Sequence, residues 1–244
     1  MAYRYATTRR DHSDLSSGRV LFSAPGFPAF PVRLASEIFQ RARARGREGP
    51  VTVWDPCCGS GYLLTTLAIL HGKEISAVIA SDIDPAAVSL ARRNLRLLAR
   101  HGLHTRAAAL REGAELFGKP AYADAAAAAE RLAPARLEDN RSLSTRVAIA
   151  DVFDPGQLRE ALGDERPGLV IADIPYGEQT TWSGVDPDAA LADMLSAVAE
   201  VVDRNAVIAI STRGRRVRAG EGHRRLASFR IGSRAVAIFA ASDS

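Results

Sequence analysis

The chain has 244 residues, of which 47% are hydrophobic, so it can fill one sizeable core and is not disordered as a whole. No apolar run approaches the roughly 18 residues of a membrane-spanning helix, and no secretory signal begins the chain. We therefore expect a cytoplasmic protein without membrane contact. The net charge is +4, and 32 basic residues include only two lysines, Lys73 and Lys119, which favours an anionic partner.

Cysteine and histidine give no sign of a disulfide or a metal site. The only cysteines, Cys57 and Cys58, are adjacent, and neighbouring cysteines rarely pair. The five histidines are scattered along the chain. We expect buried thiols in a reducing compartment and no bound metal.

Residues 1–50 predict an N-terminal arm followed by a helix that packs on the core. The first twenty residues are polar and have no sustained periodicity, and the prolines between Phe22 and Pro31 exclude regular structure. Apolar positions from Val32 onward predict a helix that ends in an arginine-rich stretch before Gly46.

Residues 51–244 predict one α/β domain, because β-rich runs and helical stretches alternate there. Strands are expected at 51–54, 77–80, 147–150, 169–172, 206–210 and 234–240, and helices at 62–70, 86–100 and 188–202. Alanine-rich helical segments from 102 to about 146 interrupt this alternation and predict a helical insertion. We find no internal repeat and no second core. We also expect the protein to be a monomer.

Aspartates follow four of the expected strands: Asp55, Asp82, Asp151 and Asp173. One aspartate at a strand end is commonly a helix cap. In an open parallel sheet, however, ligands bind beyond the carboxyl ends of the strands. Four aspartates in register therefore predict a binding site at that edge.

The first strand leads into a turn with the spacing Asp55-x-x-x-Gly59-x-Gly61. Glycines allow a ligand to approach the backbone closely. Leu64 stands where a dinucleotide site requires a third glycine, and the lysine of a phosphate-binding loop is missing. Asp82 could bond ribose hydroxyls at the end of the next strand. A nucleoside without phosphates fits best, and S-adenosylmethionine is a common one.

Four segments resemble the motifs of class I S-adenosylmethionine-dependent methyltransferases: residues 53–61, 81–95, 150–153 and 173–176. The resemblance implies a Rossmann-like fold with a mostly parallel seven-stranded sheet and helices on both faces. It also implies that Asp151 bonds the adenine amino group. The expected cofactor-binding residues are Asp55, Gly59, Gly61, Asp82, Asp84, Asp151 and Val152.

The segment Asp173-Ile174-Pro175-Tyr176 resembles the catalytic motif of methyltransferases that act on nucleobase nitrogens. The Asp173 carboxylate and the Ile174 carbonyl are acceptors that could hold a base N–H, and Pro175 would stiffen them. Tyr176 offers a face on which a flipped base can stack. An ordinary strand end followed by a Pro-Tyr turn is the alternative.

The whole chain further resembles the avilamycin-resistance rRNA methyltransferase family of actinomycetes. This resemblance implies a guanine in 23S rRNA as the substrate, in free RNA or in the large ribosomal subunit, and resistance to a ribosome-targeting antibiotic. An acidic first motif residue suits a proton donor such as guanine N1–H or the N2 amine. The residues do not distinguish these atoms; the resemblance favours N1.

Two groups of arginines are candidates for RNA binding. The first group lies in a glycine-containing segment that we expect to be a flexible loop: Arg213, Arg215, Arg216, Arg218, Arg224 and Arg225. The second group, Arg9 and Arg10, lies in the N-terminal arm. Such residues suit phosphate contacts that position an RNA without reading its sequence. A solvated basic loop without a partner is the alternative.

Three other functions remain open from the sequence. A DNA amino-methyltransferase could carry the same catalytic motif, although the insertion is small for a DNA-recognition domain. A non-catalytic RNA-binding module could keep the fold, although Gly59, Gly61, Asp82 and Asp173 are intact. A nicotinamide dehydrogenase is disfavoured by Leu64 and by the lack of a catalytic Tyr-Lys or His pair.

Overall fold

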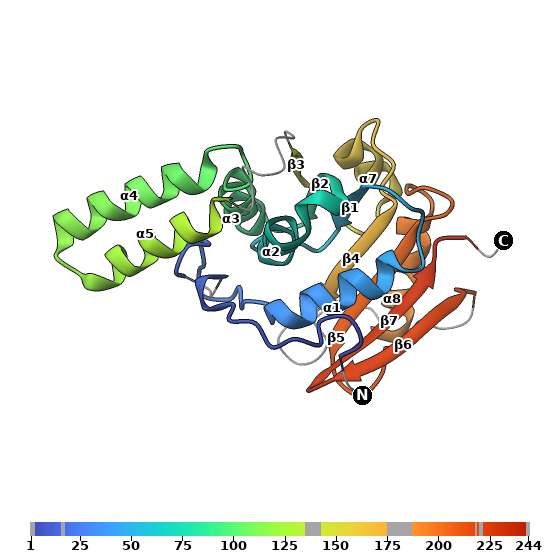
Figure 1. Cartoon of the computed structure of the whole chain (residues 1–244). Helices are drawn as coiled ribbons and strands as arrows, with labels where there is room; N and C mark the ends of the chain where they lie inside the picture. Colours follow the sequence, from blue (N-terminus) through green and yellow to red (C-terminus); the bar gives the residue numbers. More distant parts are fainter. Residues whose placement is uncertain are drawn as a thin grey trace.

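The computed structural model describes residues 3–15, 18–134, 143–174, 187–217, 219 and 222–242. Its centre is a seven-stranded sheet with the order β3-β2-β1-β4-β5-β7-β6 (Figure 1). Strands β1 to β5 pair in parallel, and β7 lies antiparallel between β5 and β6. The strands are β1 Val51–Asp55, β2 Ile75–Asp82, β3 Ser144–Ile149, β4 Leu169–Ile174, β5 Val207–Arg213, β6 Arg225–Ile231 and β7 Arg234–Ala240.

Helices cover both faces of this sheet. Side chains of α1, α2 and α3 join one hydrophobic cluster, and side chains of α7 and α8 join the other. These helices are α1 Val32–Arg43, α2 Tyr62–His71, α3 Pro85–Arg96, α7 Pro155–Leu162 and α8 Pro187–Ala199. Short 3-10 turns lie at Ser13–Leu15 (η1) and Gly72–Glu74 (η2). The predicted fold class, a mostly parallel α/β sheet with helices on both faces, is confirmed.

Strand side chains alternate between the two clusters, as the pleat requires. In β4, Leu169 and Ile171 face α1 and α2, whereas Val170 and Ala172 face α7 and α8. All four are buried, which explains why this strand reads as a continuous apolar run. The same parity places Asp173 on the α1 side.

Several boundaries differ from the sequence-based prediction. Strand β3 begins at Ser144, inside the expected insertion, and α3 ends at Arg96 rather than near residue 100. Helix α7 was not predicted; it has only eight residues and begins at the Asp154 cap. Strand β6 was missed as well, because it is an edge strand with a single buried residue and few β-branched residues.

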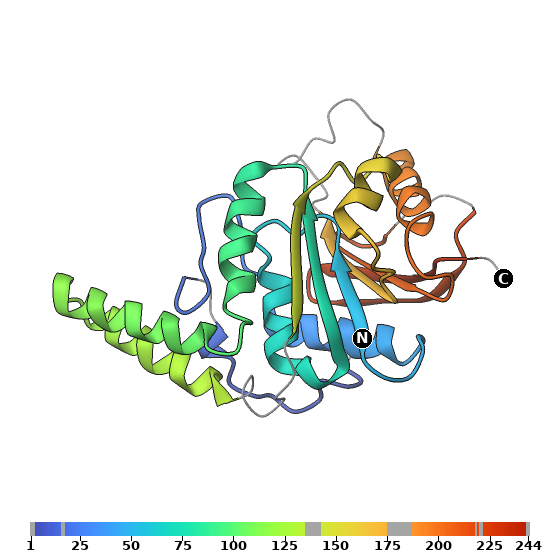
Figure 2. The ribbon, with the colours of Figure 1, turned by 90° about the horizontal axis from the view of Figure 1, so that it is seen from above.

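The insertion forms a helical hairpin of α4 Gly102–Phe117 and α5 Pro120–Leu132. Figures 1 and 2 show it extending away from the sheet. Small side chains let the two helices approach closely, and four alanines of α5 are buried: Ala125, Ala126, Ala128 and Ala129. Leu116 and Phe117, at its far end, are exposed.

The N-terminal segment lies on the sheet domain through a buried carboxylate of α1. Glu37 accepts hydrogen bonds from the backbone N–H groups of Arg4, Tyr5 and Ala6, at 2.6, 2.9 and 2.8 Å. It also pairs with Arg41 at 2.6 Å. Burial opposes ionisation, but these donors hold the pKa of Glu37 below its ordinary value.

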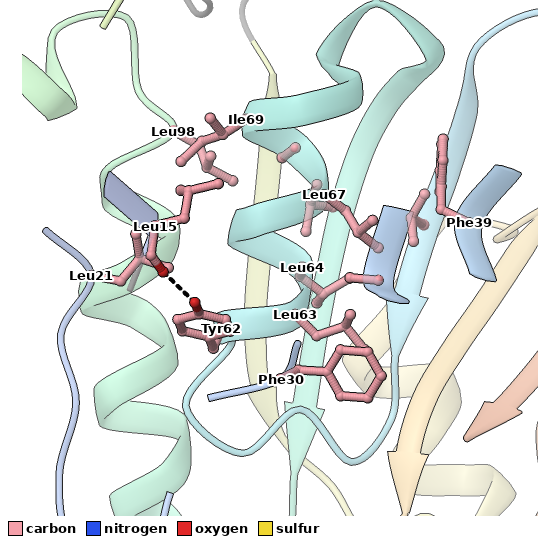
Figure 3. Close-up of a cluster of buried hydrophobic side chains, with 14 of the residues drawn as sticks. Leu15, Leu21, Phe30, Phe39, Tyr62, Leu63, Leu64, Leu67, Ile69 and Leu98 are labelled. Atoms are coloured by element: carbon pink, nitrogen blue, oxygen red, sulfur yellow. Dashed lines mark hydrogen bonds between the residues drawn. The ribbon is translucent and has the colours of Figure 1, made fainter. Parts of the chain in front are cut away.

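The following residues enter the core beside α2. Leu15, Leu21 and Phe30 are buried in the same cluster as the α2 leucines (Figure 3). The Tyr62 hydroxyl donates a hydrogen bond to the Leu15 carbonyl, drawn as a dashed line. No helix among the described residues is long and apolar enough to cross a bilayer.

Candidate active site at the carboxyl edge of the sheet

The strand order brings the four sequence-predicted aspartates to one edge. Strands β3, β2, β1 and β4 are consecutive neighbours in the sheet. Asp82 and Asp55 end β2 and β1, Asp173 is the next-to-last residue of β4, and Asp151 follows β3 by two residues. The four carboxylates therefore follow one another along the carboxyl edge.

The glycine turn after β1 is tied to the neighbouring strand by its backbone. Cys58 N–H donates to the Ser81 carbonyl at 2.9 Å, and Gly59 N–H donates to Asp82 Oδ2 at 2.8 Å. Asp55 is only 2% exposed as a residue, and its Oδ1 accepts the Cys57 N–H at 3.0 Å. Asp55 thus stabilises the turn from inside.

The two glycines of the turn have different surroundings. Both have positive φ, 52° at Gly59 and 69° at Gly61. A Cβ on Gly61 would lie 3.0–3.1 Å from atoms of Leu95 and Ala91, so this glycine allows α2 to pack on α3. A Cβ on Gly59 would meet only the Phe27 ring, at 3.8 Å. Only Gly59 leaves space for a ligand.

Asp82 and Asp84 also differ in what their side chains do. Asp82 is partly exposed, and its two oxygens accept the Gly59 and Asp84 N–H groups. Each carboxylate oxygen has a second lone pair that can accept a hydroxyl. Asp84 caps α3 by accepting the Ala86 N–H at 2.8 Å. Ile83, between them, is 64% exposed and offers an apolar face that the sequence pattern did not reveal.

On the far side of Asp82, Asp151 and Val152 continue the edge. The Asp151 carboxylate is partly exposed and accepts the Phe153 N–H at 3.0 Å. The Val152 side chain is buried in the core, so only its backbone is open to a ligand.

Burial and mutual repulsion shape the charges of this edge. Burial raises the pKa of Asp55 well above its ordinary value, the Cys57 N–H opposes this, and the Asp82 and Asp173 charges raise it further. Burial also raises the thiol pKa of Cys57 and Cys58. Both cysteines are therefore neutral thiols and poor nucleophiles.

Asp173 has a cationic partner that the sequence did not predict. Arg234, the first residue of β7, donates from Nη1 to Asp173 Oδ1. The side chains are 28% exposed for Asp173 and 9% for Arg234. Burial raises the pKa of Asp173 above its ordinary value, and the charge and hydrogen bond of Arg234 oppose this rise. Arg234 was missed because it begins a strand, whereas the predicted site residues follow strand ends.

The rest of the predicted catalytic motif is described only in part. Ile174 ends β4 with its side chain buried, so only its backbone can act on a substrate. Pro175 and Tyr176 lie outside the described residues.

The basic segment does not form one cluster. Arg213 ends β5 at the carboxyl edge, followed by Arg215 and Arg216, and all three are exposed. Arg224 and Arg225 instead lie at the opposite edge, since Arg225 pairs with Phe239 and Phe239 pairs with Ile208 near the start of β5. The expected flexible loop also contains the buried residues Val217 and Ala219. Arg218 lies outside the described residues.

The N-terminal arginines are exposed and belong to a segment fixed on α1. Arg9 and Arg10 follow Ala6 and Thr7, whose carbonyls accept hydrogen bonds from Arg33 at 2.8 and 2.9 Å.

Comparison with known proteins identifies the family. The family described as rRNA methyltransferase AviRa matches residues 1–234. The 23S rRNA (guanine(2535)-N(1))-methyltransferase of Streptomyces viridochromogenes is 48% identical over 243 residues, which cover 99% of this chain and 97% of that protein. The chain belongs to the AviRa family of rRNA methyltransferases.

Solved structures agree with the AviRa assignment. The rRNA methyltransferase aviRa from S. viridochromogenes matches with a TM-score of 0.92 at 48% identity, covering 99% of this chain and 97% of that one. TrmN from Thermus thermophilus matches with a TM-score of 0.50 at 17% identity, covering 86% of this chain and 49% of that one, and supports the fold alone. The predicted resemblance and the prediction of an rRNA methyltransferase are confirmed.

Proposed function

We propose that this protein transfers a methyl group from S-adenosylmethionine to N1 of a guanine in 23S rRNA, and that Asp173 accepts the N1 proton. The observation that carries the proposal is a half-buried carboxylate beside a ligand-accessible glycine turn, at the edge where this fold binds ligands. N1 is favoured over N2 because the relative from S. viridochromogenes is named for N1.

The residues of the edge fit S-adenosylmethionine. Gly59 leaves space for the methionine part, and the remaining lone pairs of Asp82 suit two ribose hydroxyls. Exposed Ile83 suits the adenine face, and Asp151 suits the adenine amino group. Asp55 and Asp84 would act by holding the turn and the start of α3. When bound, the cofactor supplies an electrophilic methyl group on a sulfonium that leaves as a neutral thioether.

Guanine N1 needs help from the protein because its lone pair is delocalised and the atom carries a proton. The Asp173 carboxylate can accept this proton as the N1–methyl bond forms, acting as a general base. The backbone at Ile174 can hold the base in place, so that geometry and electrostatics supply the rate enhancement. A base reaches such a buried acceptor by leaving its stack.

Asp173→Asn tests the assignment of the base. Asparagine keeps the shape of aspartate but cannot take a proton, so methyl transfer should fall about 100-fold or more, while the cofactor Kd stays within about twofold. Transfer of tritiated methyl groups to naked 23S rRNA, to large subunits and to DNA gives the substrate class in the same assay. Full activity of the variant, or activity on DNA alone, would refute the proposal.

Resistance is the proposed cellular consequence. Expression of the wild-type protein in an avilamycin-sensitive strain should raise its tolerance, and Asp173→Asn should not. Equal tolerance with both proteins would show that resistance does not depend on methyl transfer by this protein.

The exposed arginines at the carboxyl edge are the proposed RNA contacts. Replacing Arg213, Arg215 and Arg216 with alanine should raise the RNA KM and reduce the salt dependence of log affinity by about 0.7 per lost contact. Arg204→Ala, an exposed arginine before β5 at the opposite edge, is the matched control. An unchanged salt slope in the triple variant would move the RNA surface elsewhere, with Arg9 and Arg10 next.

A further inference from the structure

Arg234 is the only buried basic side chain in the described part of the chain, which is otherwise rich in exposed arginines. A buried cation is unfavourable unless an anion pairs with it. Its hydrogen-bonded anion is Asp173, two strands away in the sheet. The cost of burying this pair indicates that Arg234 has a task beyond packing.

Three elements fix the position of the guanidinium. The β6–β7 turn places Arg234 opposite Arg213 of β5 and opposite Ile231 of β6. The guanidinium carbon lies 4.6 Å from the ring centre of Phe30, the residue that precedes the N-terminal cap of α1. The rotamer of Arg234 is thus held by a strand, a turn and an aromatic ring.

Charged groups face Asp173 from β1 on one side and from β5 and β7 on the other. Asp55 of β1 is a buried acid whose pKa the Asp173 charge raises, so the two carboxyl groups repel each other. On the other side, Arg234 of β7 and Arg213 of β5 lower the pKa of Asp173. Between them lies Ser211 of β5, directly opposite Asp173 in the ladder. Burial favours the neutral acid of Asp173, whereas the two arginines favour its carboxylate.

We propose that Arg234 is a positioning residue that keeps Asp173 ionised and fixes the direction of its carboxylate for a guanine base. The inference rests on the proposed function, because a general base must begin each turnover without its proton. When Asp173 takes the N1 proton, the ion pair is lost for that step, which drives the proton onward to solvent. A neutral residue at position 234 would shift Asp173 toward its protonated form, which cannot accept the N1 proton.

The test compares pH–rate profiles of wild type, Arg234→Met and Arg234→Lys with saturating cofactor. Removal of the cation raises the pKa of Asp173, so the ascending limb should move to higher pH. If the ascending limb moves by about one pH unit, the rate of the variant at pH values on that limb falls about tenfold relative to wild type. At high pH the two rates should stay close. Lysine keeps the positive charge but lacks the planar guanidinium group. The ascending limb of Arg234→Lys should therefore lie between those of wild type and Arg234→Met.

Arg41→Met is a matched control within the same protein. Arg41 also pairs with a buried carboxylate, Glu37, and its guanidinium lies 4.1 Å from the centre of the Phe229 ring. This variant should lose stability in thermal unfolding and keep the wild-type pH limb. Cofactor affinity, measured by calorimetry, should stay unchanged in all the folded variants.

The outcomes separate this inference from the proposed function. The proposed role of Arg234 is overturned if the ascending limb of the pH–rate profile does not move in Arg234→Met. It is also overturned if the limb moves equally far in Arg41→Met. If Arg234→Met does not fold, Arg234→Lys decides, since a limb identical to wild type overturns the proposal as well. Full activity of Asp173→Asn would instead overturn the function of Asp173 itself.

Discussion

The two glycines of the first turn should respond differently to the same small substitution. Both have positive φ, so alanine at either position incurs the left-handed backbone cost of about 1–2 kcal/mol. At Gly59 the new methyl group meets only Phe27 at ordinary contact distance. At Gly61 it lies about 3 Å from Leu95 and Ala91 of α3, and such overpacking costs roughly a further 1–3 kcal/mol.

Urea unfolding of Gly59→Ala and Gly61→Ala gives the two free energies of unfolding, with equal m-values as the check on a two-state transition. Gly61→Ala should be less stable by the overpacking difference of about 1–3 kcal/mol, within the roughly 5–15 kcal/mol stability of a typical domain, so it still folds. Gly59→Val should lose affinity for S-adenosylmethionine, because its side chain enters the space left for the ligand. Equal destabilisation at both positions would show that the α2–α3 contact is not what requires Gly61.

Three further variants test the surroundings of the site. Asp82→Ala should weaken cofactor binding by about 1–3 kcal/mol in calorimetry, because the ribose hydroxyls lose their acceptor. Tyr62→Phe should cost about 1–3 kcal/mol of unfolding free energy, since the buried Leu15 carbonyl loses its donor. Wild type should lose stability as the pH falls below about 4.5, where unfolded Glu37 takes up protons while the folded state, with its lowered pKa, resists. Glu37→Gln should lack that contribution at neutral pH, and its stability should depend less on acid.

The sequence predicted the carboxyl edge well because strands β1, β2 and β4 are buried on both faces. Such strands read as short apolar runs, and the polar residue that ends each run marks the edge. Asp55 and Asp82 end their strands, and Asp173 is the next-to-last residue of its strand. The hydrophobic pattern does not distinguish a strand-end residue that faces a ligand from one that faces the turn. The inward orientation of Asp55 is therefore visible only in the structure.

In the arginine-rich segment, the high density of charge in the sequence led to a wrong prediction of one continuous basic surface. Six arginines within thirteen residues suggest one surface, yet the chain crosses from one edge of the sheet to the other between Arg216 and Arg224. The crossing carries buried Val217 and Ala219, which a purely solvated loop would not have. Proximity in sequence therefore predicted proximity in space only for the part that follows β5.

Arg234 could not be found by inspecting strand ends, and the reason is topological. In parallel strands, the carboxyl edge receives the last residue of each strand. Strand β7 runs the other way, so its first residue lies at that same edge, delivered by the short turn after β6. An antiparallel strand inserted beside β5 can thus bring a cation to Asp173 without interrupting the parallel strands that hold the glycine turn. The half-buried carboxylate thereby gains a cation that opposes the rise of its pKa on burial.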